Sequence, residues 1–366
     1  MTHRFTSRRI KPALSRLSVR IHHRALNSLL ALVLAAAALP GSASPGAASP
    51  TGIETPIITR PMTTPSPTPQ DLVAALQGTF GRHAGARASH AKGFCATGEF
   101  FPSFTAQHLT SAALYQEKRL AATIRFSIGG GNPRISDKAR AVRGLAIRLQ
   151  GERERHELVL ISEPIFFAAT PTSFVEFLKA RIPDPATGKP DPDKVKAYAK
   201  AFPDGTRQPA LVASHAPTAS YATTSYHSTH AFAFNAEGAR TWARLVAAPV
   251  AGLAFLSPDD EATGPDAFLE AEAIARLERA PVEFIVYAQP AAPGDSIVDP
   301  TQSWTQDGPA PIELGLLKVR ARAEATACDV GTFIPTVLPA GIEPSDDPIL
   351  LARAASYGVS LNQRRR

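Results

Sequence analysis

The sequence predicts an antiparallel α+β fold, and two observations point to it. Segments with the composition of strands dominate the middle of the chain, and helical patterns interrupt them at irregular intervals. A doubly wound parallel sheet would instead alternate strands and helices regularly. Because no repeat or second low-complexity break follows residue 70, we expect residues 71–366 to form a single domain.

Each expected element rests on its own local pattern. Strands are expected where β-branched residues concentrate or where apolar and polar residues alternate. These segments are Ala121–Ile128, Val142–Gln150, Glu157–Ile161, Val282–Ala288 and Glu313–Val319, with a further one at "SYHSTHAFAF". Helices are expected at Asp71–Gln77, Ser173–Ala180, Asp193–Ala201 and Asp266–Arg279. The last of them would place Leu269, Ala273 and Leu277 on one face.

The first 70 residues have the composition of an export leader and a linker. A basic stretch precedes an apolar run, Leu29–Leu39, and then small residues, which is the order of a secretory signal over residues 1–44. That run is short for a membrane span, so we expect a periplasmic or secreted protein without stable membrane insertion, unless an uncleaved leader anchors it. "SRRIK" at residues 7–11 is a weak sign of twin-arginine export. Residues 45–70 are rich in Pro, Ser and Thr and are expected to be a flexible linker.

The distribution of charge argues against one class of partner, and the two cysteines leave the disulfide content open. The net charge of +7 comes from the leader, because residues 1–24 hold seven Lys and Arg, and the remaining 32 basic residues balance 32 acidic ones. No nucleic-acid binding is therefore expected. Cys95 and Cys328 are too few for a disulfide scaffold, and they can form one bridge or remain two free thiols.

Several familiar motifs are missing or incomplete. The glycines of "SIGGGNPR" at Ser127–Arg134 lack the Lys-Ser/Thr of a P-loop and the spacing of a dinucleotide fingerprint, so we expect an irregular loop. G-x-S-x-G and H-E-x-x-H are absent. His227 and His230 are three apart on an expected strand and would point to opposite faces, which argues against a metal pair.

Three other segments carry chemistry. "GARASHAKGF" places Arg87 and His90 among small residues, and "TIRFSI" puts Arg125 and Ser127 on one face of a strand. In "DDPILLARAASY", Arg353 and Tyr357 lie one helical turn apart and must be neighbours. A guanidinium beside a phenol stabilises phenolate, which is a good axial ligand for ferric haem. Spare arginines would suit the haem propionates.

Together these segments resemble the catalase family. The similar stretches are "R-x-x-H-A-K-G" at Arg87–Gly93, "R-F-S" at Arg125–Ser127, "V-R-G-L-A-I-R-L" at Val142–Leu149, "E-P-I-F-F" at Glu163–Phe167, and Phe333–Tyr357. Their order holds over nearly the whole of residues 71–366. The resemblance implies an eight-stranded antiparallel β-barrel with flanking helices around haem b (iron protoporphyrin IX).

The resemblance also implies roles for single residues. His90 would be the distal acid and base, with Ser127 as its orienting partner. Tyr357 would be the proximal iron ligand, with Arg353 at its phenolate oxygen. Residues expected to contact haem propionates are Arg87, Arg125 and Arg364, and those expected to line the haem pocket are Phe174 and Phe333.

Three positions depart from the family pattern. The distal asparagine is replaced by Ile161, a channel valine by Ser89, and an aspartate after the haem ligand by Val359. We expect this protein to lack the C-terminal helical region and the N-terminal threading arm of typical catalases. These features resemble the small catalase-related peroxidases, and a shorter chain is expected to leave a more open channel.

We therefore expect a haem peroxidase that acts on hydrogen peroxide or organic peroxides, uses a small organic reductant and has weak catalase activity. Ile161 cannot donate a hydrogen bond to peroxide, which favours peroxidase over dismutase chemistry. The alternatives are a true catalase, an enzyme of lipid hydroperoxides, and a haem carrier of the envelope without turnover. A carrier would need no distal base such as His90. A monomer or small homo-oligomer is expected.

Overall fold

The computed structural model describes residues 65–366, which belong to one compact unit. The predicted signal peptide and most of the predicted linker lie outside the described residues. No helix within residues 65–366 combines the length and the apolar character needed to cross a membrane.

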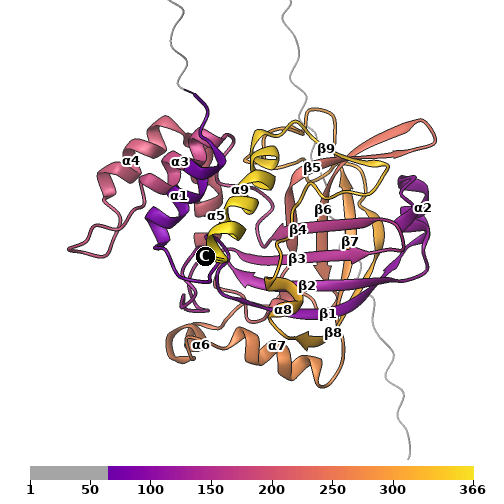
Figure 1. Cartoon of the computed structure of the whole chain (residues 1–366), viewed down its shortest axis with the longest axis horizontal. Helices are drawn as coiled ribbons and strands as arrows, with labels where there is room; N and C mark the ends of the chain where they lie inside the picture. The colour runs from indigo at the N-terminus through magenta and orange to yellow at the C-terminus, as the bar shows by residue number, and fades with distance from the viewer. Residues whose placement is uncertain (1–64) are drawn as a thin grey trace, which may run out of the picture. The chain divides into compact units, whose positions relative to one another are not determined.

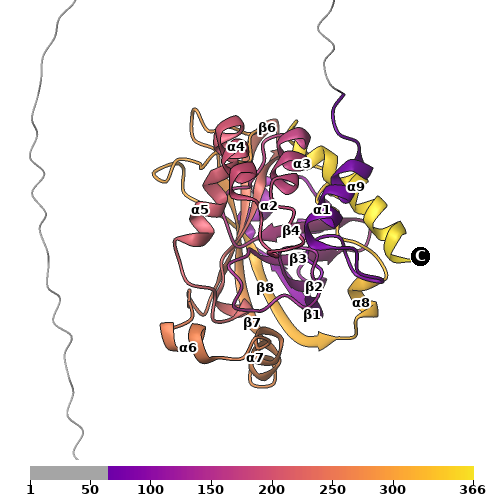
Figure 2. The same ribbon diagram turned by 90° about the vertical axis from the view of Figure 1, so that its left-hand side faces the viewer.

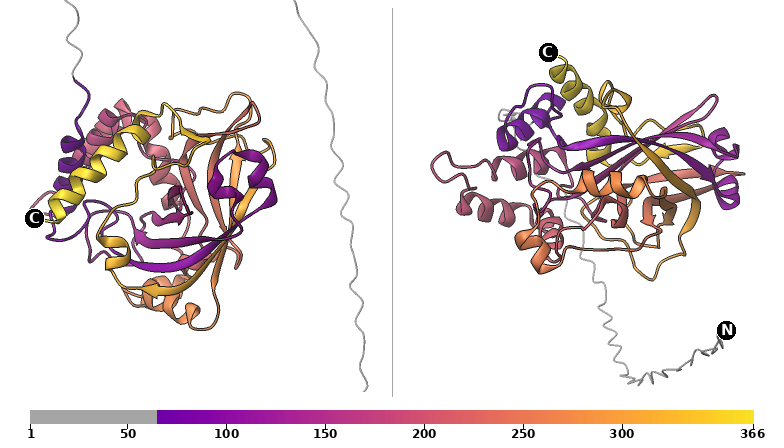
Figure 3. Two further views of the ribbon diagram at one scale, coloured as in Figure 1. Left: turned by 45° about the vertical axis from the view of Figure 1, so that its right-hand side comes forward. Right: turned by 90° about the horizontal axis from the view of Figure 1, so that it is seen from below.

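The centre of the domain is an antiparallel β-barrel, which confirms the expected fold class. The strands are hydrogen-bonded in the order β4-β3-β2-β1-β8-β7-β6-β5, and a pairing of Ile161 with His227 joins β4 to β5 and closes the barrel. A short ninth strand adds to β5. The strands are β1 Gly93–Pro102, β2 Leu120–Ile128, β3 Arg143–Gln150, β4 Arg155–Ile161, β5 Tyr226–Ala236, β6 Ala239–Pro249, β7 Val282–Pro290, β8 Ile312–Ala323 and β9 Ile342–Pro344. Figure 3 shows these strands wrapping around one interior.

The helices gather mainly at one side of the barrel. They are α1 Pro69–Phe80, α2 Phe104–Leu109, α3 Pro171–Lys179, α4 Pro192–Ala201, α5 Arg207–Ala213, α6 Pro258–Thr263, α7 Leu269–Leu277, α8 Thr326–Asp329 and α9 Pro348–Arg364. Figures 1 and 2 show α1, α3 and α9 side by side next to the strands, with α7 beneath β7 and β8. A second apolar cluster lies between α1, α3 and α9 and includes Leu72, Phe174 and Ile349.

All four expected helices begin one to three residues away from the expected start, and two of these shifts have clear local reasons. α1 begins at Pro69, before the expected start at residue 71, because Thr68 and Asp71 form a capping box around its first turn. α7 begins at Leu269 rather than at residue 266. The carboxylate of Asp137 accepts hydrogen bonds from the backbone N–H groups of Phe268 and Leu269, at 2.7 and 2.8 Å, and so marks the start of α7.

The barrel interior is packed with aliphatic and aromatic side chains. Phe126 contacts the rings of Phe94, Tyr221 and Phe284, and all four side chains are buried. The buried pair of Tyr115 and His156 is a polar exception, with 2.9 Å between the phenol oxygen and Nδ1. Burial lowers the pKa of His156 to about 3, so this ring is neutral in the folded protein.

This buried histidine makes stability depend on pH. Its pKa in the folded chain lies below the ordinary value of 6.5, so the unfolded chain binds more protons as pH falls and stability is lost below pH 6.5. Between pH 7 and pH 5 this single group costs about 2 kcal/mol. We expect a His156→Gln variant to lose less stability than the wild type over this interval, by about that amount. Urea unfolding at both pH values measures the difference, and equal losses would contradict a buried neutral His156.

Candidate active site

Helix α9 carries one half of the site. Asp347 caps its start by accepting hydrogen bonds from the N–H groups of Ile349 and Leu350, and Pro348 occupies the first turn. One turn further on, Arg353 donates to the Tyr357 phenol oxygen from Nε at 2.9 Å and from Nη2 at 2.6 Å. The predicted contact between these two residues is therefore confirmed. Two guanidinium donors on one oxygen stabilise negative charge there.

His90 and Ser127 form the opposite half. His90 Nδ1 lies 3.0 Å from Ser127 Oγ, which leaves Nε2 as the ring nitrogen available to a ligand. His90 has a positive φ of 53°, a conformation unusual for a residue with a side chain. Neighbouring bonds hold it there, because Ala91 N–H donates to Gly130 O at 3.0 Å and Ala88 N–H donates to Ser360 Oγ at 3.2 Å. The second bond ties the His90 loop to α9.

Burial and nearby arginines keep His90 neutral. Desolvation is the main cause, and the positive charges of Arg125, Arg353 and Arg87 add to it, so that the pKa of His90 falls to about 3. An imidazole with this pKa is unprotonated at neutral pH. It can accept a proton from a ligand but does not hold one permanently.

The three candidate propionate-binding arginines meet one short segment. Arg87 Nη2 donates to Cys328 O and to Asp329 Oδ1, both at 2.9 Å. Arg125 Nε lies 3.4 Å from the same carboxylate oxygen, and Arg364 Nη2 donates to Gly331 O at 2.8 Å. The Nε atoms of Arg87 and Arg125 are buried and have no hydrogen-bond partner among the described residues. Burial and the charge of Arg87 lower the pKa of Arg125 to about 10.

The two pairs, His90–Ser127 and Arg353–Tyr357, line one cavity of about 470 Å³ together with the three arginines. Phe174 and Phe333 line it as well, and so do Ile161 and Ser89 at two of the departures from the family pattern. Lys92, two residues after His90, does not line this cavity and forms an ion pair with Asp137 at 2.6 Å. The predicted site residues lining the cavity are Arg87, His90, Arg125, Ser127, Phe174, Phe333, Arg353, Tyr357 and Arg364.

Comparison with known proteins settles the family. The catalase family model matches residues 77–366, which is most of the chain. The chain belongs to the catalase family. Members of this family are oxidoreductases that act on peroxide.

Two relatives of similar length support the assignment within the catalase family. A catalase-related peroxidase of Synechococcus elongatus is 36% identical over 303 residues, covering 82% of this chain and 89% of the relative. Another, from Mycolicibacterium paratuberculosis, is 33% identical over 300 residues, covering 81% of this chain and 95% of the relative. A fungal catalase structure superposes with a TM-score of 0.70 at 21% identity, over 77% of this chain and 60% of the other, and shows the shared fold.

Sequence reasoning missed a buried hydrogen-bonded contact between a histidine and an aspartate at the start of helix α9. His230 Nδ1 lies 2.6 Å from Asp347 Oδ2, and both side chains are fully buried. The carboxylate of Asp347 therefore makes two kinds of contact, because it caps α9 and also contacts His230. The expectation that His227 and His230 alternate on a regular strand does not hold either, because a bulge lies between His227 and Ala231.

Gly144 on β3 is a second residue that sequence reasoning missed. A Cβ at this position would lie 2.5 Å from Ser127 Oγ and 2.7 Å from His90 Nδ1, closer than packing allows. The absence of a side chain therefore makes room for the His90–Ser127 contact. The stretch "V-R-G-L-A-I-R-L" contains this glycine, but no role was assigned to it, because the need for it arises from the pairing of β3 with β2.

We expect a Gly144→Ala variant to displace His90 and lower the rate of peroxide consumption by up to about 100-fold. The added methyl group must push away either the serine or the imidazole. Gly78→Ala on α1 is the matched control, because its Cβ would meet only Ile182 Cδ1 at 3.6 Å. Steady-state rates of both purified variants decide the matter, and wild-type turnover by the Gly144 variant would contradict the close packing.

Proposed function

We propose that this protein is a haem b-dependent peroxidase that reduces hydrogen peroxide or organic peroxides with electrons from a small organic reductant, and that its catalase activity is weak. One observation carries the proposal: the His90–Ser127 pair and the Arg353–Tyr357 pair line the same cavity, and Ile161 lines it too. Family membership supports peroxide as a substrate.

The residues of the cavity suit haem. The lining offers a phenol oxygen as an iron ligand, apolar side chains for the porphyrin, and arginines for two propionates. The buried Nε atom of Arg87, which has no hydrogen-bond partner among the described residues, favours an anionic group, because buried donors are costly to leave unpaired. A volume of about 470 Å³ also falls within the usual range for cofactor sites.

Haem, when bound at Tyr357, supplies the redox chemistry of peroxide reduction. His90 moves the protons: its neutral Nε2 can accept a proton from one peroxide oxygen and return it to the departing oxygen, which leaves as water or an alcohol. Ser127 fixes the ring orientation for both transfers through Nδ1. The guanidinium of Arg353 stabilises negative charge on the Tyr357 oxygen.

Ile161 favours the peroxidase reaction over dismutation. It is the last residue of β4, pairs with Gly144 and is 7% exposed. An isoleucine offers no hydrogen-bond donor to hold a second peroxide in the cavity. A reductant that delivers electrons one at a time needs no such donor.

The neutral His90 also separates this function from haem carriage. A carrier has no use for a base held by Ser127 in a strained backbone conformation.

We also propose export to the periplasm or the cell exterior. The basic and apolar leader supports this location, as does the bond between Cys95 and Cys328, because disulfides persist in oxidising compartments.

The test is an assay of oxygen release and phenolic dye oxidation on the haem-loaded full chain. We expect rapid dye oxidation and little oxygen from the wild type with hydrogen peroxide. Ile161→Asn restores an amide donor and should raise the ratio of oxygen release to dye oxidation by about tenfold or more. Vigorous oxygen release by the wild type would identify a catalase, and inactivity in both assays with haem bound would identify a carrier.

A further inference from the structure

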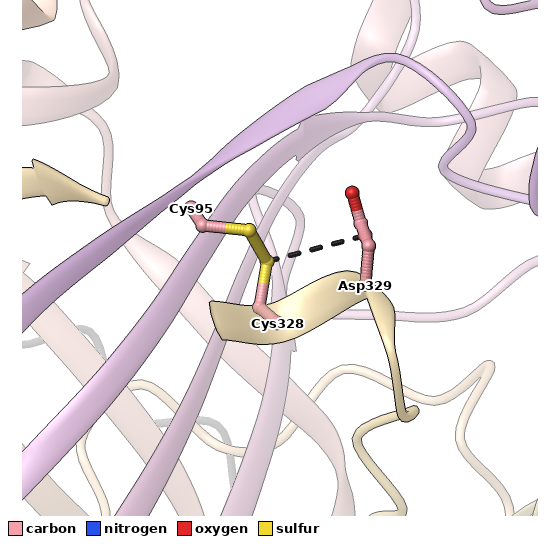
Figure 4. A group of neighbouring side chains, drawn as sticks. All are labelled: Cys95, Cys328 and Asp329. Atoms are coloured by element: carbon pink, nitrogen blue, oxygen red, sulfur yellow. Dashed lines mark hydrogen bonds between the residues drawn. A yellow bond between two sulfur atoms is a disulfide. The ribbon is translucent and has the colours of Figure 1, made fainter. Parts of the chain in front are cut away.

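We call Arg87, Arg125 and Arg364 the arginine cluster. A disulfide lies next to the residues that this cluster contacts. Cys95 on β1 is bonded to Cys328 on α8 across 233 residues of sequence. Both cysteines are buried, at 1% and 2% exposure, and they pack with Phe333 of the cavity wall. Figure 4 shows the bond between the strand and the short helix, with Asp329 next to it.

Residues 328–331 supply most of the polar contacts of the arginine cluster, and Arg125 Nη2 also donates to Ala91 O at 3.3 Å. The contacting groups of residues 328–331 are the carbonyl of Cys328, the carboxylate of Asp329 and the carbonyl of Gly331. These oxygens orient guanidinium groups that burial would otherwise destabilise. The positions of Arg87 and Arg364, and in part that of Arg125, therefore depend on where residues 328–331 lie.

Local structure alone is a weak anchor for this segment. Helix α8 has only four residues, Thr326–Asp329, and no side chain caps its start. A helix of this length is not stable by itself. Asp329 is also 40% exposed, so its ion pairs are open to competition from water. The covalent bond to β1 is the strongest restraint on these residues.

A metal site is the competing interpretation of this cluster. The ligand atoms of Cys95, Cys328 and Asp329 lie within 4.8 Å of one another. The two sulfurs are bonded to each other, however, and two guanidinium groups already lie at the carboxylate. These guanidinium groups would repel a metal cation and attract an anion.

We propose that the Cys95–Cys328 disulfide positions the arginine cluster for a ligand with two carboxylates, and thereby determines how tightly the propionates of haem are held. Three guanidinium charges and one carboxylate leave a net charge of +2, which matches two propionates. Cys95 and Cys328 are positioning residues, because neither lines the cavity. The inference rests on the proposed haem binding.

The experiment compares haem with haem dimethyl ester, which lacks the two carboxylates. Each is loaded into the full chain, and its transfer to an excess of an apoglobin is followed by absorbance. In a Cys95→Ser/Cys328→Ser variant we expect haem to leave about tenfold faster than from the wild type, since charge-assisted hydrogen bonds would be weakened. The ester should leave the variant and the wild type at the same rate.

Wild-type protein treated with a phosphine reductant after folding is the second sample, in case the variant folds poorly. The same reductant on the serine variant controls for effects on the haem iron. Faster release of both haems to the same extent would show a merely structural bond and overturn the proposal, as would unchanged release of both. A wild type that binds neither haem would overturn the proposed function and this inference with it.

Discussion

Replacing Tyr357 with phenylalanine is expected to abolish binding of ferric haem. The change removes one oxygen atom and keeps the aromatic ring, so the packing of α9 is conserved. Without that oxygen, the two hydrogen bonds from Arg353 lose their acceptor, and the proposed iron ligand is lost. Haem content and the absorption spectrum of the purified variant measure the effect. A variant that retains haem with an unchanged spectrum would remove Tyr357 from the site.

A control on the same helix separates ligand loss from damage to α9. Leu351 is 49% exposed and does not line the cavity. We expect Leu351→Ala to bind haem as the wild type does. Circular dichroism of both variants should show the same helix content, because neither change removes a helix-capping contact.

Replacing His90 with alanine is expected to lower kcat/KM for peroxide by about two to four orders of magnitude. The variant lacks the neutral nitrogen that accepts and returns the proton, yet Tyr357 and the arginine cluster are untouched. Haem binding should therefore persist while turnover falls. This combination distinguishes a proton-transfer role from a structural one, and retained turnover would refute the assignment.

The matched control for this prediction is His83→Ala. The His83 ring contacts the carbonyl of Phe80 at 3.0 Å, and His83 does not line the cavity. Its removal deletes a histidine from the same stretch of chain without touching the proposed chemistry. Both variants should be compared at equal haem occupancy.

Local patterns in the sequence predicted the proximal pair but could not join it to the distal pair. Arg353 and Tyr357 are four residues apart on one helix, so their contact follows from helical geometry. His90 and Tyr357 are brought to one cavity by the closure of the barrel and the packing of α9 on α1. Only the resemblance to the catalase family placed them together in advance.

The first strand escaped prediction because of its glycines. β1 contains Gly93 and Gly98, which weaken a strand pattern in sequence. In the barrel, a Cβ at either position would lie 2.2 Å from a backbone carbonyl of a neighbouring strand, that of Phe126 or Lys318. The residues that obscure the strand in the sequence are the ones that let its neighbours approach.

Contacts between residues far apart in the sequence could not be predicted from local patterns. His230 and Asp347 meet across 117 residues, and nothing near either one in sequence signals the other. The two cysteines were left open as a bridge or as free thiols, and the structure joins them. Such contacts depend on which strands become neighbours, which the residues flanking each partner do not encode.

The haem content of the purified full chain tests the central claim most directly. Extraction into acidic ketone followed by a pyridine spectrum identifies the porphyrin and counts it. We predict about one non-covalent haem b per chain, because the cavity lined by Tyr357 offers one phenol ligand. Protein folded with an intact Cys95–Cys328 bond that takes up no haem when it is supplied would contradict the account.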